Sequence, residues 1–154
     1  MILTDADVDG SHIKGLLINL FHHFWPSLLK QSGFIKSMMT PIVKAKHKTD
    51  IKVFYTLTDY ENWKASGDVS NYEIKYYKGL GTSSSQEAKE YFKDLDKSEI
   101  RYLWNEDQAV DLTMNLAFNK DMADDRKEWL GNYDRNSIIE HNQTDISIPD
   151  FINK

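Results

Sequence analysis

The sequence predicts an α/β fold in which short strands alternate with helices, followed by a helical C-terminal extension. An apolar strand pattern at residues 1–4 leads through an acidic turn into a helical pattern, and a second strand pattern at 72–77 leads through a glycine loop into another helix. Beyond residue 105 the apolar residues recur at helical spacing. We therefore expect part of a sheet with flanking helices, and then a region built of helices.

The composition of the chain narrows its class. The 154 residues suffice for about one domain, and a hydrophobic content of 40% with 28% charged residues is typical of a soluble chain. No apolar run approaches the roughly 20 residues that a membrane span requires, and the absence of cysteine excludes disulfides, zinc thiolates and thiol nucleophiles. The net charge of −5 gives no overall basic excess, so the lysine-rich stretch from Lys30 to Lys52 could meet a polyanion only locally.

Three carboxylates, Asp5, Asp7 and Asp9, alternate directly after the first strand pattern. In an extended segment alternate side chains share one face, so these three acids would repel one another unless a cation lay among them. A site with few protein ligands, all of them oxygens, suits Mg²⁺. The sequence therefore predicts a metal site at the carboxyl end of a strand, where open α/β sheets bind their ligands.

The acidic segment has two other interpretations. Its pattern is also that of an EF-hand calcium loop, but the twelfth position counted from Asp5 is Leu16 where such a loop carries a glutamate, and no helical pattern precedes it. The second is a solvated turn that binds no metal, since aspartate and glycine are common in turns. Local chemistry alone leaves the second alternative open.

A helix is predicted after the acids, with Ser11 as its N-cap and its end at Phe24, before the Trp25–Pro26 pair. The adjacent residues His22 and His23 point about 100° apart on a helix, which argues against a shared metal site. We expect these two histidines to serve packing or to lie on the surface.

Two strands are predicted in the middle of the chain. Residues 34–46 form an extended run in which Pro41 disfavours a helix, and the apolar residues alternate from Ile51 to Leu57 as in a strand with one buried face. Thr58 and Glu61 have the spacing of a capping box that would open the next short helix.

The glycine loop after residues 72–77 is the second informative stretch. Ser84 and Glu87 form a capping box, and the helix that they open is predicted to run to about residue 94. Glycines beside a helix N-terminus, with Lys78 at the entry, could accept an anionic oxygen such as that of a phosphate. A plain tight turn requires the same glycines, so both interpretations remain open here.

The last third of the chain is predicted to be helical and then polar. One helix is expected from Asn105 through Leu116 and another, capped by Asn119, through Leu130. Arg126 and Lys127 lie among acids on the second helix, where surface ion pairing is the ordinary interpretation. After a polar stretch a new apolar element begins near the C-terminus, so the chain is expected to be a piece of something longer.

Six strings of residues span nearly the whole chain in a fixed order: 4–19 (TDADVDGSHIKGLLIN), 25–29 (WPSLL), 40–45 (TPIVKA), 75–83 (KYYKGLGTS), 124–130 (DDRKEWL) and 150–154 (DFINK). Together they resemble the landmarks of the type IIA DNA topoisomerases, particularly of the eukaryotic and large-virus branch. Six landmarks in order are far more specific than any one of them.

The resemblance implies that the chain begins within a Toprim domain, a Rossmann-like sheet whose acids hold Mg²⁺ beside the scissile phosphate of DNA. By position, Asp5 resembles the carboxylate shared by two metal ions, Asp7 the second ligand, and Asp9 a supporting acid, so that Asp5 and Asp7 would be catalytic through the metal. The implied parts are the C-terminal portion of Toprim (1–95), a helical extension (96–131), a linker (132–149) and the start of a DNA-gripping winged-helix region (150–154).

The same resemblance implies contacts with double-stranded DNA. Arg126 and Lys127 would contact its backbone, Lys78 would lie in the core near the site, and Lys154 would open the winged-helix region. The whole enzyme would also use ATP, which this chain would not bind, and would be a homodimer acting inside the cell, in the nucleus or at a viral or phage replication site, with no membrane partner.

Parts of that family's catalytic machinery have no counterpart in this chain. A Glu-Gly-Asp-Ser-Ala-type string with the first catalytic glutamate and the arginine–tyrosine pair with the nucleophile are both absent from it. We therefore expect a fragment or a split subunit that is inactive alone. Two alternatives stay open: a stand-alone metal-dependent phosphatase or nuclease using Asp5, Asp7 and Asp9, and a non-catalytic nucleic-acid-binding module.

Overall fold

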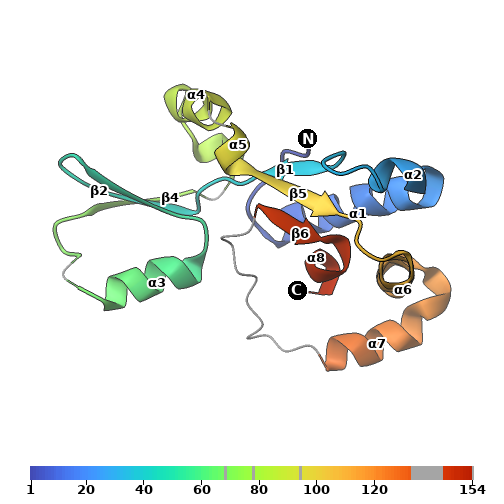
Figure 1. The fold of residues 1–154 in the computed structure, drawn as a ribbon. Coiled ribbons are helices and arrows are strands. Elements are labelled where there is room, and N and C mark those ends of the chain that lie inside the picture. The colour runs from blue at the N-terminus through green and yellow to red at the C-terminus, as the bar shows by residue number, and fades with distance from the viewer. Residues whose placement is uncertain (68, 78, 94, 133–143, 154) are drawn as a thin grey trace. The chain divides into compact units, whose positions relative to one another are not determined.

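The computed structural model describes residues 1–67, 69–77, 79–93, 95–132 and 144–153, which form a mixed α/β structure as expected (Figure 1). In chain order its elements are α1 (Val8–Phe24), α2 (Pro26–Leu29), β1 (Lys36–Met38), β2 (Val43–His47), β3 (Asp50–Phe54), α3 (Leu57–Ala65), β4 (Glu73–Tyr76), the 3₁₀ turn η1 (Leu80–Thr82), α4 (Ser85–Lys93), α5 (Leu95–Ser98), β5 (Glu99–Leu103), α6 (Asp107–Phe118), the 3₁₀ turn η2 (Lys120–Met122), α7 (Ala123–Gly131), β6 (Asp145–Ser147) and α8 (Ile148–Asn153).

These elements form two compact units that are interleaved in the sequence. Unit 1 contains Met1–Ile2, Ile13–Ser37 and Ile100–Lys154, and unit 2 contains Leu3–His12 and Met38–Glu99. Residues near the beginning of the chain and residues near its end thus belong to the same unit. From the sequence, each part was expected to be one continuous segment.

Unit 1 is organised around a three-stranded sheet in the order β1-β5-β6. Strands β5 and β6 are parallel, and Ile2 makes a single parallel bridge to Ser37, where the sequence predicts the end of a strand. The hydroxyls of Ser37 and Tyr102 lie 2.9 Å apart inside this unit. The buried side chains of its core are Ile18, Leu29, Ile35, Tyr102, Val110, Met114 and Ile148.

The helices of unit 1 pack closely on this core. A side-chain carbon on Gly15 of α1 would lie only 3.1 Å from the ring of Phe118, at the end of α6, so glycine permits the close approach of the two helices.

None of the helices in the described residues combines the length and the apolar character that a membrane span requires.

Unit 2 contains a second three-stranded sheet, in the order β3-β2-β4, and both of its pairings are antiparallel. The register places Val43 of β2 beside Phe54 of β3. Helix α3 covers this face with Tyr60 and Trp63, whose rings lie 5.5 Å and 5.1 Å from the ring of Phe54. These aromatic contacts form the core of the unit.

Two strand predictions were wrong in detail. The extended run at 34–46 is divided between β1 and β2, which belong to different sheets and are separated by residues that include Pro41, a residue with no N–H for a sheet hydrogen bond. In β3 the buried residue is Phe54, while Ile51 and Val53 are 57% and 40% exposed. Helix α3 covers the Phe54 face, so the alternation predicted the strand but not which face is buried.

Some element boundaries also differ from those predicted. Thr56, rather than Thr58, caps α3, because its hydroxyl accepts a hydrogen bond from the amide of Asp59 at 2.9 Å. Strand β6 and the start of α8 lie in the range expected to be a linker, of which residues 133–143 fall outside the described part. The two predicted helices of the last third are present as α6 and α7, and Asn119 caps η2, which leads into α7, as expected.

Candidate metal centre

The acidic segment turns directly into helix α1. The side chain of Asp7 accepts a hydrogen bond from the amide of Gly10 at 2.7 Å, and its carbonyl accepts one from Ser11 at 3.0 Å, so Asp7 is the N-cap in place of the predicted Ser11. Asp9 consequently lies in the first helical turn. The expectation that three acids project from one face of an extended segment was therefore wrong, because the helix begins earlier than predicted.

Asp5 lies between two glycines of unit 2. A side-chain carbon on Gly79 would lie 2.5 Å from Cγ of Asp5 and 2.6 Å from both carboxylate oxygens, and one on Gly10 would collide with the carbonyl oxygen of Asp5. The hydroxyl of Thr4 is buried and has no hydrogen-bond partner within the described residues. The carboxylate of Asp5 is thus packed directly against the backbone of the glycine loop.

The donor chemistry of this segment fits a hard cation such as Mg²⁺. Asp5, Asp7 and the hydroxyl of Thr4 offer only oxygen ligands, and Mg²⁺ binds to proteins through one or two carboxylates while keeping several waters. Among the described residues, no three His, Cys, Asp or Glu side chains are grouped so that they could hold a metal by themselves. The oxygen atoms of this segment are thus of the type that Mg²⁺ prefers, with Asp9 following on the first turn of α1.

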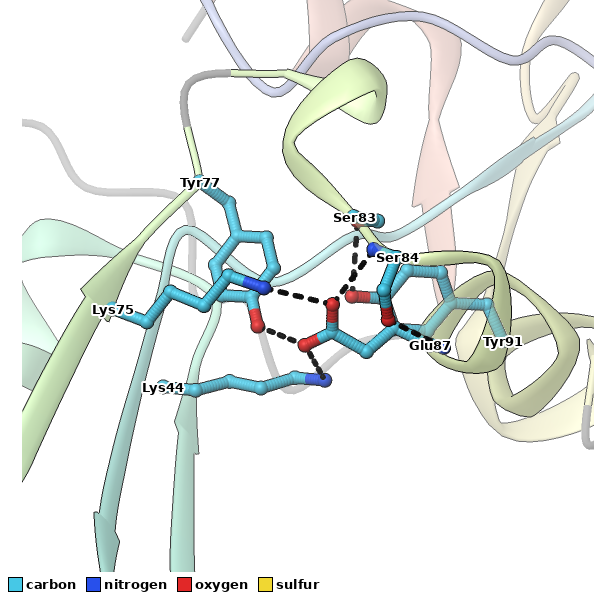
Figure 2. Close-up of polar contacts among 7 residues, drawn as sticks. All are labelled: Lys44, Lys75, Tyr77, Ser83, Ser84, Glu87 and Tyr91. Atoms are coloured by element: carbon cyan, nitrogen blue, oxygen red, sulfur yellow. Dashed lines mark hydrogen bonds and ion pairs between the residues drawn. The ribbon is translucent and has the colours of Figure 1, made fainter.

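The loop that carries Gly79 is anchored by Glu87 of α4 (Figure 2). Its Oε1 atom accepts hydrogen bonds from the hydroxyl of Tyr77 and from Nζ of Lys44 at 3.2 Å. Its Oε2 atom accepts from Nζ of Lys75 and from the amide of Ser84, each at 2.9 Å. The amide of Glu87 donates to the hydroxyl of Ser84 at 3.3 Å, which confirms the predicted capping box.

These contacts fix the ionisation of the cluster around Glu87. Burial alone would raise the pKa of Glu87, but hydrogen bonds from Tyr77, Ser84 and the two lysines outweigh it and hold that pKa well below its ordinary value. Burial, followed by the hydrogen bond to Glu87, raises the pKa of Tyr77. The cluster therefore contains an ionised carboxylate and a neutral phenol over the physiological range.

The sequence predicts Glu87 as a helix cap, but not its contacts with two lysines and a tyrosine. Lys44 of β2 and Lys75 of β4 are directly paired across the sheet, and such like charges destabilise a sheet unless an acid lies between them. The pairing register carries this information, and it is not visible before the sheet is known. Before the sheet is known, the sequence shows only that each of two predicted strands contains a lysine.

The expected DNA contacts divide into two groups. Arg126 donates from Nη1 to carbonyls at the end of α6, the nearest being that of Leu116 at 2.9 Å, while Lys127 pairs with Asp124 at 3.2 Å and has an 80% exposed side chain. Lys78 and Lys154 lie outside the described residues.

The two adjacent histidines of α1 make different contacts. His22 contacts the carboxylate of Asp111 at 2.8 Å and stacks on Trp104, whereas the ring of His23 packs edge-on against Phe24. They serve packing and surface contacts, as expected from their spacing.

The whole chain is similar to known proteins. Residues 38–154 match the family model of the C-terminal associated domain of TOPRIM. The chain is 48% identical over 154 residues to DNA topoisomerase 2 of Plasmodium falciparum and 51% identical over 158 residues to mitochondrial DNA topoisomerase 2 of Dictyostelium discoideum, in both cases over 100% of its own length. It covers 11% and 12% of those proteins, so it spans about a tenth of their length.

A solved structure agrees with these relatives. The fold matches the crystal structure of the Plasmodium falciparum topoisomerase II DNA-binding, cleavage and re-ligation domain with a TM-score of 0.92 at 48% identity. The match covers 98% of this chain and 20% of that one. The chain belongs to the type IIA DNA topoisomerase family, within which residues 38–154 form the C-terminal associated domain of TOPRIM.

Proposed function

We propose that the chain supplies the Mg²⁺-binding part of the DNA cleavage and religation core of an ATP-dependent type II topoisomerase. The observation that carries this proposal is the packing of the Asp5 carboxylate against Gly79, in a chain that matches a DNA-cleaving domain over 98% of its length. Double-stranded DNA is the corresponding substrate. The proposed site of action is intracellular, in the nucleus or at a viral or phage replication site.

In this proposal Asp5 and Asp7 hold the metal and Asp9 supports the site. The bound Mg²⁺ would stabilise negative charge on the scissile phosphate and on the leaving 3′ oxygen. Asp7 accepts the Gly10 amide with one carboxylate oxygen, which fixes its side chain and leaves the other oxygen for the cation. The start of α1 additionally favours negative charge at this place.

The proposed DNA contacts are Arg126, Lys127, Lys78 and Lys154. Lys127 is best suited to a phosphate, because its side chain is 80% exposed and its ion pair with Asp124 is on the surface. Arg126 would contact DNA with the part of its guanidinium that does not hold the end of α6.

We further propose that the chain alone is inactive. Two carboxylates make a partial metal site, and no tyrosine of this chain lies in the sequence context of the family's nucleophile. The remaining ligand and the nucleophile would come from other segments or subunits of the same enzyme, which is expected to be a homodimer.

Metal binding by the chain tests the proposal. We expect weak Mg²⁺ binding, at about millimolar concentration, since Mg²⁺ gives up its waters reluctantly and a partial site offers little in exchange. Asp5→Asn should abolish it in calorimetry or in Mn²⁺ paramagnetic relaxation, while Asp125→Asn, a matched change of an exposed acid on α7, should not. Binding that is insensitive to Asp5→Asn would contradict the proposed site.

DNA cleavage separates this function from the alternative of a stand-alone nuclease. Purified chain with Mg²⁺ should leave supercoiled plasmid intact. Cleavage that Asp5→Ala abolished would support the nuclease instead.

A further inference from the structure

The loop that carries Gly79 is fastened at both ends to a single carboxylate. Tyr77, directly after β4, donates its hydroxyl to Glu87, and Ser84, directly before α4, donates its amide to the same side chain (Figure 2). Tyr77 is 6% exposed, and its amide is bonded to the carbonyl of Ile42 at 2.8 Å, so this end of the loop is also fixed to the sheet.

Two lysines hold the carboxylate in place from the sheet side. Lys44 and Lys75 each donate to a different oxygen of Glu87, and the side chains of Lys44 and Glu87 are only 16% and 17% exposed. Lys44 and Glu87 are thus largely shielded from solvent, whereas Lys75 is 46% exposed, and the hydrogen bonds between these charged groups make their geometry specific. The ammonium of Lys75 also lies 4.7 Å from the ring centre of Tyr77, which restrains that ring further.

The described part of the loop between these two anchors, residues 79–83, contains a turn. The amide of Thr82 donates to the carbonyl of Gly79 at 3.0 Å, which closes the turn η1. Next to this turn the backbone of Gly79 lies so close to Asp5 that an added side-chain carbon would displace the Asp5 carboxylate or the turn. Any shift of the turn must therefore move against the Asp5 carboxylate or away from it.

We propose that Glu87 is a positioning residue for Asp5, acting through the loop and Gly79. Glu87 holds both ends of the loop, the loop fixes Gly79, and Gly79 restricts the orientation of the Asp5 carboxylate. The role of Glu87 in metal binding rests on the proposed function, whereas its effect on the contact between Gly79 and Asp5 does not.

The contact is measured first without metal. In nuclear Overhauser spectra of the chain, the α protons of Gly79 should give cross-peaks to the β protons of Asp5. We expect Glu87→Gln to weaken these cross-peaks and to shift the amide resonance of Gly79, because two lysines and a phenol lose their ionised acceptor. Glu90→Gln, the same charge change at an exposed position of α4, should change neither. Unchanged cross-peaks in a folded Glu87→Gln variant would overturn the inference.

Mn²⁺ binding provides the second measurement, as changes in supporting residues reduce metal affinity by about tenfold or more. Glu87→Gln should weaken Mn²⁺ binding by about this factor, and in combination with Gly79→Ala the two losses should not add, since both act on the same contact. Additive losses would contradict a common route through Gly79. If wild-type chain shows no Mn²⁺ binding sensitive to Asp5→Asn, the proposed metal site fails while the contact measurement still decides the role of Glu87.

Tyr77→Phe provides the same test should Glu87→Gln not fold. It removes one of the donors without altering any charge, and it releases Tyr77 from Glu87 while the amide of residue 77 stays bonded to Ile42. The cross-peaks between Gly79 and Asp5 should weaken in this variant as well, and their persistence would argue against the proposal.

Discussion

Nη1 of Arg126, on α7, donates a hydrogen bond to the carbonyl oxygen of Leu116, on α6, at 2.9 Å. The same nitrogen lies 3.0 Å from the carbonyl oxygen of Ala117 and 3.2 Å from that of Asn119. The last carbonyls of a helix have no hydrogen-bond partner within it and carry the negative end of its dipole. A cation from the next helix donates hydrogen bonds to these carbonyls and also compensates the negative charge. Arg126 therefore fixes the corner between α6 and α7.

Arg126→Gln should lower the free energy of unfolding by about 1–2 kcal/mol, because three carbonyls lose a charged donor that is only partly exposed. Urea unfolding measures the change. Lys127→Gln is the matched control and should change stability by about 0.5 kcal/mol or less, since its side chain is 80% exposed. Equal effects of the two substitutions would show that the capping contacts contribute nothing.

The buried hydroxyl pair in unit 1 provides a second prediction. Ser37 and Tyr102 are 0% and 3% exposed, and each hydroxyl has the other as its partner at 2.9 Å. Tyr102→Phe or Ser37→Ala alone should lower the free energy of unfolding by about 1–3 kcal/mol, because one buried hydroxyl loses its partner. The double variant should lose less than the sum in a double-mutant cycle. Simple additivity would mean that the two hydroxyls do not depend on each other.

The lowered pKa of Glu87 predicts that the folded chain loses stability in acid. Its pKa is lower in the folded chain than its ordinary value of 4.5, because the hydrogen bonds to its ionised form outweigh its burial. Below pH 4.5 the unfolded chain therefore binds a proton that the folded chain does not, and the free energy of unfolding falls as the pH falls. Above pH 4.5 the full contribution is present.

The test compares urea unfolding of wild type and variants between about pH 7 and pH 3. Glu87→Gln should lower stability at neutral pH and make its decline in acid shallower. Glu90→Gln, on the exposed side of α4, should keep the wild-type slope. An unchanged acid slope in Glu87→Gln would contradict the lowered pKa.

Gly10→Ala should disrupt the start of α1. A side-chain carbon there would collide with the carbonyl oxygen of Asp5 and lie 3.1 Å from the hydroxyl of Thr4. We expect a loss of about 1–3 kcal/mol, as for other forced overpacking. Gly131→Ala, at the end of α7, where no atom of the described residues lies within 4 Å of the added carbon, should instead leave stability unchanged or raise it by up to about 1 kcal/mol. Thermal or urea unfolding distinguishes the two outcomes.

Local patterns predicted the helices of this chain better than its strands. The helices around Val110, Met122 and Trp129 and the capping box of Ser84 and Glu87 depend on residues within one or two turns, and they were found at nearly the right bounds. Which face of β3 is buried depends on where α3 packs, a long-range contact. For this reason the alternation that starts at Ile51 was assigned to the wrong face.

The candidate site shows the same division between local and distant information. Spacing identified Asp5, Asp7 and Asp9 as a group of acids, but it could not show that the capping bond of Asp7 would begin a helix at Val8. The contact between Asp5 and Gly79 joins segments far apart in sequence, and no pattern within either segment encodes it. The positions of the acids can therefore be predicted from the sequence, whereas the contacts that hold their side chains in place cannot.

The interleaving of the two units has a consequence for the order of folding. Most of unit 2 is one continuous stretch, Met38–Glu99, so its sheet closes short loops that cost little chain entropy. The sheet of unit 1 must join β1 to β5 across that stretch, and β5 to β6 further on. During synthesis on the ribosome, unit 2 can therefore form first. Once folded, it would hold residues 38 and 99 in place, which shortens the effective loop between β1 and β5 that unit 1 has to close.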